Sequence, residues 1–349
     1  MLTALPVSRP EGKSLIGRAA AATQTKLAGC PLLRLETIRS AADICLAVAR
    51  GKFFQRRLIN SMLSIIPCVA LSMPLSEVVF VSSHPTVNGS VLGMRDFLEQ
   101  QGVSTECWSS ESDIRGGDQL LVFYRDSLEF NPSASPDQIL QMDQIAGKVI
   151  AAGWKLFNQS MPWVQDKAEE YELYEALEIG HLLPWQPAGA GSDVPQSFDS
   201  DMYVVKPRVG ECGNGVERFA NWSDASQYAC SLGPSVIQAY QPGKVVRVIT
   251  TADRVLTSYE KLPQDEGEWV AAIAKGARRV PFTLPLGAGE VATRFTKLVD
   301  ADLIGFDLIV EDDDFWLLEA NAAPGMSRPV IDLIDPAPLM AVLQGALRS

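Results

Sequence analysis

Two apolar runs near the end of the sequence constrain its fold more than any other feature. Residues 303–310 and 315–320 are mainly hydrophobic, each run contains one acidic side chain, and the acidic segment 311–314 separates them. Apolar runs joined by a short polar segment predict an antiparallel β-hairpin, and we place its tip at Asp313. Because side chains alternate between the two faces of a strand, this tip fixes which residues face each other.

The predicted pairing sets two carboxylates against each other inside the hairpin. Counting back from the tip, Asp307 lies opposite Glu319, and the alternation puts Asn321 on the same face. Opposed carboxylates within apolar strands repel one another, and a divalent cation removes that repulsion. Ligands that offer only oxygen suit Mg²⁺ bound to phosphates. These three residues are therefore the predicted metal ligands, and a surface hairpin with solvated acids is the alternative.

A second feature combines a lysine with closely spaced glycines. Residues 203–207, YVVKP, predict a strand that carries Lys206, and Gly210, Gly213 and Gly215 follow it. Glycines let backbone N–H groups approach phosphate oxygens, and the lysine adds a positive charge. The segment is not a Walker A loop, because no Gly-Lys-Ser/Thr sequence opens a helix. Alone, it indicates either a phosphate site or an ordinary hairpin loop.

Composition narrows the class of protein. The chain has 349 residues and a net charge of −12, which argues against a general nucleic-acid binder. Its six cysteines include no CxxC pair, and it has only two histidines, so we predict neither a zinc site nor a Ser-His-Asp triad. The uncharged run 58–75 contains two prolines. We therefore expect a cytoplasmic protein without stable membrane insertion.

Charge and periodicity distinguish two parts within the first 160 residues. Residues 1–75 contain ten Lys or Arg but three Asp or Glu, and they predict a basic helical N-terminal extension. Its basic face either binds an acidic partner or is simply solvated. Residues 76–160 alternate apolar runs with helical stretches, which is typical of a small parallel α/β domain. Its strands are predicted at 78–81, 120–124 and 148–152.

The order of these features resembles the ATP-grasp superfamily. A lysine-bearing strand, a glycine-rich segment, central strands and an acidic hairpin follow one another over about residues 76–335. The segments 305–307, GFD, and 318–325, LEANAAPG, resemble the magnesium-binding segments of that family. The likeness is greatest to the branch that contains ribosomal-protein glutamate ligases and bacterial glutathione synthetase.

The resemblance implies a fold and its division. We expect an α/β (α+β) protein in which residues 161–349 form the ATP-grasp domain after the small parallel domain. Its nucleotide-binding part covers about 161–240, and its magnesium-binding, catalytic part covers about 241–335.

The resemblance also implies a nucleotide site. Lys206 corresponds to the lysine that holds the α- and β-phosphates of ATP, and Lys167 corresponds to the first nucleotide-binding lysine of the family. The glycines within 210–215 correspond to the mobile loop over the phosphates. Gln238 and Tyr240 lie in the segment that corresponds to the linker strand whose backbone reads adenine. An acid is customary at the position of Gln238, so this chain departs from the pattern there.

Three basic residues are the candidates for catalysis. Arg247 matches an arginine of the active-site sheet, although the family often has Asp where this chain has Val245. Lys275 and Arg278 resemble a basic loop near the phosphate and acyl groups, and a surface basic cluster is the alternative for them. A second departure is Ala323, which stands where the family usually has serine.

The activity that the resemblance implies is a ligation. ATP and Mg²⁺, with Mn²⁺ as a substitute, activate a carboxylate as an acyl phosphate, and an amine then forms an amide or peptide bond. The substrate is an amino acid, a peptide or a peptide-like metabolite; alternatively, the basic N-terminal segment recruits a protein or ribosomal precursor peptide. A non-catalytic ATP-binding regulator is the third hypothesis. The family also suggests a homodimer. We expect Asp307→Asn or Glu319→Gln to abolish turnover and leave the fold intact.

Overall fold

The computed structural model describes most of the chain from residue 75 onward. The described residues are 75–81, 89–108, 113–116, 121–124, 147–158, 166–189, 197–210, 213–265 and 267–347. The predicted basic extension, up to residue 74, lies outside them. The chain divides into two compact units, Met1–Ser72 and Met73–Ser349, and the description below concerns the second. No helix among the described residues has the length and apolar character needed to cross a bilayer.

The first sheet of this unit is parallel, as the sequence predicts. Its strand order is β2-β1-β3-β4, and all three neighbouring pairs run in the same direction. The strands are β1 (Glu77–Val81), β2 (Ser104–Trp108), β3 (Leu121–Tyr124) and β4 (Lys155–Leu156). Helix α3 (Gly89–Gln100) comes between β1 and β2 in the chain and buries one apolar face, made by Val91, Met94, Phe97 and Leu98.

One predicted strand of this sheet is wrong. Residues 147–151 are helical, and the strand is the short β4 that follows. Only Val149 is buried in that helix, so the run lacks the successive buried side chains of a strand covered on both faces. Gly153, with φ 95°, ends the helix, and its N–H donates to the carbonyl of Ile150. A short apolar run does not distinguish the two structures by pattern alone.

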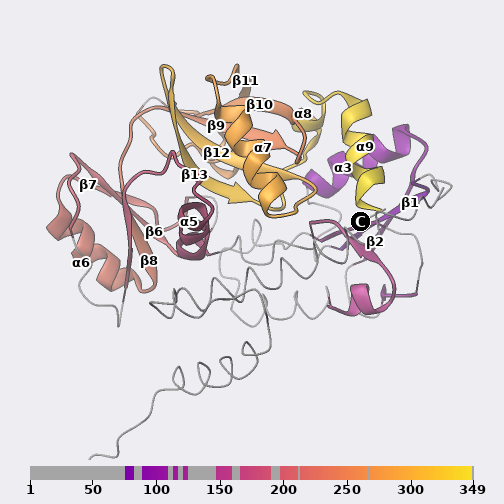
Figure 1. Cartoon of the computed structure of the whole chain (residues 1–349), viewed down its shortest axis with the longest axis horizontal. Helices are drawn as coiled ribbons and strands as arrows, with labels where there is room; N and C mark the ends of the chain where they lie inside the picture. The colour runs from indigo at the N-terminus through magenta and orange to yellow at the C-terminus, as the bar shows by residue number, and fades with distance from the viewer. Residues whose placement is uncertain are drawn as a thin grey trace, which may run out of the picture. The chain divides into compact units, whose positions relative to one another are not determined.

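The second sheet is antiparallel and carries the predicted lysine strand. Its order is β5-β8-β6-β7. The strands are β5 (Trp185–Ala188), β6 (Tyr203–Pro207), β7 (Glu217–Phe219) and β8 (Ser235–Ala239). Helix α6 (Trp222–Leu232) packs on this sheet, where Ala225 and Ala229 share a core with Val205 and Ile237 (Figure 1).

The third sheet is also antiparallel and holds the acidic hairpin. Its order is β11-β10-β9-β12-β13. The strands are β9 (Lys244–Thr250), β10 (Val255–Leu262), β11 (Arg278–Pro281), β12 (Ile304–Glu311) and β13 (Asp314–Asn321), and the short helix η4 (Ile273–Lys275) precedes β11. Helices α5 (Lys167–Ala176) and α7 (Ala288–Leu298) bury their apolar faces in the same core as this sheet, and Figure 1 shows α7 lying across it.

The turn of the acidic hairpin differs from the prediction. Glu311 pairs with Asp314, so the turn consists of Asp312 and Asp313 alone. Asp312 adopts a left-handed conformation with φ 51°, which aspartate tolerates better than most residues. The predicted tip at Asp313 is therefore wrong, because the centre of the turn lies between the two residues.

A β-bulge restores the predicted pairing of the acids. From the turn back to Leu308, which faces Leu317, the strands follow the register of the two-residue turn. The register shifts between Asp307 and Leu308, and Asp307 then faces Glu319. Without the bulge, Asp307 would face an apolar neighbour of Glu319. The bulge thus turns both carboxylates to the same place on the sheet.

The C-terminal helices join the parallel sheet to the rest of the unit. Helices α8 (Arg328–Ile331) and α9 (Pro336–Ala346) share an apolar core with α3 and β1. The packing of α3 on α8 is close at Gly93, where an added Cβ would lie 2.6 Å from the carbonyl oxygen of Met326 and 2.7 Å from the backbone nitrogen of Arg328.

This close approach predicts opposite effects for two helical glycines. Gly93→Ala is expected to destabilise the protein by about 2 kcal/mol, because the overpacking cost exceeds the gain in helix propensity. Gly345→Ala in α9 meets nothing within 4 Å and is expected to stabilise the protein by up to about 1 kcal/mol. Urea unfolding of the two variants measures both signs. An unchanged midpoint for Gly93→Ala would contradict the close packing of α3 on α8.

Candidate functional site

The start of helix α5 is fixed by its N-cap. The Asp166 carboxylate accepts hydrogen bonds from the backbone N–H groups of Ala168, at 2.9 Å, and Glu169, at 3.4 Å. The Arg208 guanidinium, just after β6, donates to the same carboxylate at 2.9 Å from Nε and lies 2.7 Å away at Nη2. The backbone N–H of Lys167 also donates to the carbonyl of Arg208. The first turn of α5 is thereby held beside the end of the lysine strand.

This arrangement brings Lys167 to the glycine-rich segment and to the acidic hairpin. Its Nζ donates to the carbonyl oxygen of Gly210 at 2.8 Å and lies 3.9 Å from Oε2 of Glu319. The predicted nucleotide-binding lysine therefore lies between two other predicted site residues, one after β6 and one on β13.

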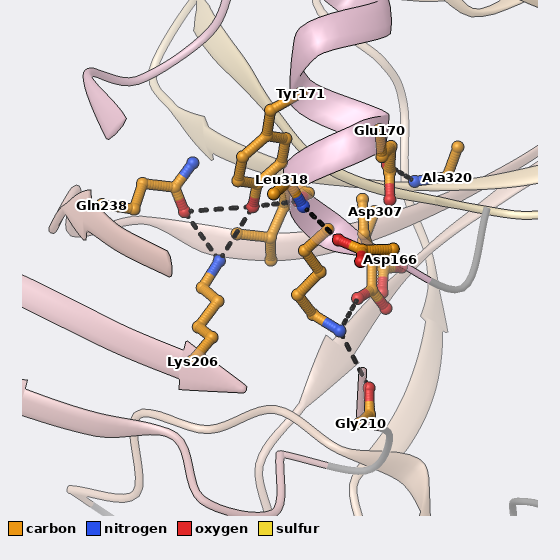
Figure 2. A network of polar contacts seen from close by, with 12 residues as sticks. Asp166, Glu170, Tyr171, Lys206, Gly210, Gln238, Asp307, Leu318 and Ala320 are labelled. Carbon is orange, nitrogen blue, oxygen red and sulfur yellow. Dashed lines mark hydrogen bonds and ion pairs between the residues drawn. The ribbon is translucent and has the colours of Figure 1, made fainter. Parts of the chain in front are cut away.

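Lys206 is buried in the second sheet and points toward α5. Its Nζ donates to Oε1 of Gln238 at 2.6 Å and to the Tyr171 hydroxyl at 3.3 Å, as Figure 2 shows. Burial lowers the pKa of Lys206 to about 8, although the nearby carboxylate of Glu319 favours the charged form. The partner of Lys206 on β8 is the neutral amide of Gln238. Its oxygen accepts a hydrogen bond from the ammonium group without cancelling the positive charge.

Asp307 lies at the centre of a buried group of charges in the third sheet. Arg247, its cross-strand partner on β9, donates to Oδ1 from Nε at 2.5 Å and to Oδ2 from Nη2 at 2.9 Å. Lys261 on β10 donates to Oδ2 at 2.5 Å. Burial alone would raise the pKa of the Asp307 carboxyl, but the two cations and their hydrogen bonds hold that pKa well below its usual range.

Lys261 is a candidate site residue that no sequence motif reveals. Its side chain is buried, and burial, together with the charge of Arg247, lowers its pKa. One feature of the fold could have pointed to Lys261. Tyr259 faces Arg247 across the β9–β10 pair, and alternation then places Lys261 on the face that Tyr259 occupies. That feature depends on the register of two strands, which the sequence alone does not fix.

The other two predicted metal ligands lie at the end of β13. Glu319 faces Asp307, and its side chain is partly exposed. Asn321 faces Gly305, and its Oδ1 accepts a hydrogen bond from the backbone N–H of Ala323 at 2.9 Å. Within the part of the chain that the structure describes, no three His, Cys, Asp or Glu side chains are grouped to hold a metal ion. A metal site with three protein ligands among these residues would need a ligand of another kind, such as the amide oxygen of Asn321.

The two other basic candidates occupy different places. Lys275 ends η4, and its Nζ would lie 3.8 Å from a Cβ added to Gly213, while Cγ1 of Val270 would lie 2.4 Å away. The loop before β11 is therefore packed against the glycine-rich segment, where Gly213 has a φ of 72°. Arg278 is exposed on the edge strand β11 and pairs with Leu262. The structure thus brings Lys275 to the glycine-rich segment, whereas Arg278 lies exposed on an edge strand.

Tyr240, at the end of β8, takes part in an aromatic group. The Arg218 guanidinium lies 4.8 Å from the centre of the Tyr240 ring and 5.3 Å from that of Trp269. The backbone N–H of Tyr240 donates to Met202, and that of Ala239 donates to the carbonyl of Pro184. Adenine recognition by this segment would therefore need groups other than these two N–H donors.

Comparison with known proteins shows which family of domains part of the chain resembles. Residues 183–333 match the model of the RimK-like ATP-grasp domain. The matched residues include β5 to β13, with Lys206 and the whole acidic hairpin, whereas Lys167 and helix α5 come before them.

A curated relative matches a smaller part of the chain. The chain is 31% identical over 81 residues to a protein named "Probable alpha-L-glutamate ligase" from Haemophilus influenzae (strain PittEE). The match covers 23% of this chain and 27% of the relative. The chain thus spans about a quarter of the length of that relative.

Solved structures share the fold over most of the chain. D-cycloserine synthetase DcsG has a TM-score of 0.56 at 16% identity, covering 78% of this chain and 99% of its own. D-alanine–D-alanine ligase from Bacillus anthracis, solved with ATP, has a TM-score of 0.53 at 13% identity, covering 78% and 96%. The ATP-grasp ligase PsnB with a precursor peptide and AMPPNP has a TM-score of 0.53 at 14% identity, covering 79% and 98%. These likenesses confirm the predicted ATP-grasp fold.

Proposed function

We propose that this protein is an ATP- and Mg²⁺-dependent ligase that joins a carboxylate to an amine through an acyl phosphate. The observation that carries the proposal is the buried group of Asp307, Arg247 and Lys261, which lies beside Glu319 in an ATP-grasp domain. A reaction between two anions, a carboxylate and a phosphate, needs fixed positive charge where the negative charge gathers. This group of side chains provides it.

The residues fit both ATP and Mg²⁺. Asp307, Glu319 and Asn321 offer only oxygen ligands, which suits Mg²⁺ and, as a substitute, Mn²⁺. Nε2 of Gln238 is buried and has no hydrogen-bond partner in the described part of the chain. An acceptor oxygen of a bound nucleotide next to Lys206 would satisfy this donor. When bound, the metal would supply positive charge where the negative charge of the reaction gathers.

The proposed chemistry has two steps. A carboxylate oxygen attacks the γ-phosphorus of ATP, the bond to the β-phosphate breaks, and ADP leaves. The amine then attacks the acyl carbon, and phosphate leaves with the oxygen that came from the carboxylate. Lys167 and Lys206 hold the phosphates of ATP, and Arg247 with Lys261 stabilises charge near the acyl group. The amine loses its proton to phosphate oxygen or to solvent, so the proposal needs no dedicated base.

The test of this proposal is product analysis with a panel of carboxylates. Wild-type protein is incubated with ATP, Mg²⁺ and single amino acids or short peptides, and hydroxylamine serves as a general amine. We expect ADP and a hydroxamate with at least one carboxylate, because hydroxylamine traps an acyl phosphate. AMP as the product, or ADP without any hydroxamate, would contradict the acyl-phosphate step.

A peptide or protein substrate is the second candidate. PsnB, which shares the fold, was solved with a precursor peptide, and the first 75 residues of this chain are strongly basic. An acidic precursor peptide recruited by that segment would explain an inactive protein in the small-molecule panel. The full-length chain is then assayed with an acidic peptide and a neutral peptide of equal length. Faster ADP release with the acidic peptide supports this candidate, and ATP binding without any turnover favours a non-catalytic regulator.

The low pKa of Lys206 predicts how ATP binding depends on pH. In the ATP-free protein this side chain loses its proton above a pH of about 8. Phosphate oxygens favour the charged form, so bound nucleotide raises the pKa and binding takes up a proton. Affinity for AMPPNP is expected to fall by up to about tenfold per pH unit above pH 8, since one bound proton is linked to binding.

Calorimetry measures this linkage directly. AMPPNP is titrated into the protein at pH 7, 8 and 9 in two buffers with different ionisation enthalpies, which reports the number of protons taken up. Lys206→Arg, which stays charged over this range, is expected to remove the dependence. Equal affinity and no proton uptake in wild type across these pH values would contradict the coupling between the charge of Lys206 and nucleotide binding.

A further inference from the structure

The metal-ligand strand β13 lies at the edge of its sheet. β12 pairs with one side of it. On its other side, among the described residues, the strand forms one isolated β-bridge, between Leu317 and Leu182. The outward backbone groups beyond Leu317 therefore need other partners. These groups belong to the stretch that holds Glu319 and Asn321.

Two side chains of helix α5 provide partners for this edge. The Tyr171 hydroxyl donates to the carbonyl oxygen of Leu318 at 2.9 Å. Two residues further along β13, the N–H of Ala320 donates to Oε1 of Glu170 in a short hydrogen bond. Figure 2 shows both side chains reaching from α5 to β13. They bind the backbone on each side of Glu319, so the predicted ligand is held between two fixed points.

A third partner binds just beyond the strand. Nδ2 of Asn158, which follows β4, donates to the carbonyl oxygen of Ala322 at 2.5 Å and to that of Leu303 at 2.5 Å. Its Oδ1 accepts from the N–H groups of Asp302, at 2.8 Å, and Leu303, at 3.0 Å. Asn158 thus ties together the chain that enters β12 and the chain that leaves β13. The open end of the acidic hairpin is closed by one amide.

Of these residues, Glu170 is the one whose burial costs folding free energy. Its side chain is buried, and burial raises its pKa to about 8 even though the hydroxyl of Tyr174 and the N–H of Ala320 both donate to it. A buried acid generally stabilises a fold less than an apolar side chain of similar size. A role in packing alone gives no reason for an acid at this position, whereas the Ala320 N–H requires an acceptor.

We propose that Glu170 is a positioning residue that holds β13 at Ala320 and so fixes Glu319 and Asn321 relative to Lys167. Lys167 and Glu170 lie three residues apart and hence on the same side of α5. One helix therefore carries both the lysine that contacts Glu319 and the acceptor that holds the backbone next to Glu319. This inference rests on the proposed function, because it assigns Glu319 and Asn321 to the metal.

The test compares two substitutions of Glu170. Glu170→Gln keeps an oxygen that accepts from the Ala320 N–H, and we expect its kcat and Mg²⁺ dependence to stay within about threefold of wild type. Glu170→Met has a similar size but no acceptor. We expect it to need about tenfold more Mg²⁺ for half-maximal binding of AMPPNP and to lose kcat about 10- to 100-fold, the range typical when a group that orients a metal ligand is removed.

Two further variants separate positioning from stability. Tyr174→Phe removes the other donor to Glu170 and leaves the Ala320 contact in place, so it should lower the unfolding midpoint without changing the Mg²⁺ dependence. Glu172→Gln, on the exposed side of α5, should change neither. If Glu170→Met does not fold, Glu170→Asp replaces it, because the shorter side chain withdraws the acceptor and keeps the carboxyl.

The outcomes distinguish this inference from the proposed function. Normal Mg²⁺ dependence of AMPPNP binding in folded Glu170→Met or Glu170→Asp overturns the positioning role. A Glu170→Gln variant as impaired as Glu170→Met also overturns it, since the acceptor would then not be what matters. Wild-type protein that binds no AMPPNP with Mg²⁺, or that releases no ADP with any substrate tested, counts against the proposed function itself.

Discussion

Asp307→Asn is expected to abolish turnover and also to destabilise the protein by about 3–5 kcal/mol, because it leaves two buried cations without a charged partner. Arg247 and Lys261 both donate to this carboxylate, whose side chain is 4% exposed. From the sequence alone we expect this variant to keep its fold, because the sequence pairs Asp307 with another acid and does not reveal its two cationic partners. The buried ion pairs change that expectation.

Glu319→Gln is the matched control. The Glu319 side chain is 34% exposed, and its charged neighbour Lys167 is 3.9 Å away, so the loss of this charge should change the unfolding free energy by less than about 1 kcal/mol. Turnover should still be lost, because the proposed metal site loses a ligand. Urea unfolding and ADP release are measured for both variants. A wild-type midpoint for Asp307→Asn would contradict the buried charge group, and Mg²⁺-dependent turnover in either variant would contradict the metal site.

Lys206→Met is expected to weaken nucleotide binding without destabilising the fold. A hydrogen bond to a charged group contributes about 1.5–3 kcal/mol, so its removal should weaken AMPPNP binding about 10- to 100-fold. The folded state disfavours the charged lysine, as its pKa of about 8 indicates. Below that pH, an apolar side chain of similar length should therefore leave the protein as stable as wild type or more stable.

Calorimetry and urea unfolding at pH 7 test both parts of this prediction. Lys155→Met, a change of the same kind at an exposed position on β4, is the control and should leave nucleotide binding as it is. Unchanged affinity in Lys206→Met would remove this lysine from the site. A large fall in stability would show that the Gln238 contact matters more to the fold than the burial of charge costs.

Much of the fold could be predicted because its signals are local. Alternating apolar runs and helical stretches predict the parallel sheet, and the order of motifs along the chain predicts the ATP-grasp fold. Two errors arose where local patterns are ambiguous. The run 148–152 is as compatible with one buried helical face as with a strand, and a bulge at Asp307 offset the error in the position of the hairpin turn.

The candidate site could be predicted only where its residues belong to motifs. Lys167, Lys206, Arg247, Asp307 and Glu319 all come from recognisable segments, and the structure brings them close to one another. Lys261 and Glu170 belong to no such segment. Their positions depend on the register between β9 and β10 and on the packing of α5 against the edge of β13, which are contacts between distant parts of the chain.

The most direct test of the central claim follows one oxygen atom. The carboxylate that supports turnover is labelled with ¹⁸O in both oxygens, the amine is added, and the released phosphate is examined by ³¹P NMR. The account predicts one ¹⁸O atom in each phosphate, because the attacking carboxylate oxygen leaves with the phosphoryl group. Phosphate without label, released together with ADP, would mean that water attacks ATP, and the proposed ligase mechanism would be wrong.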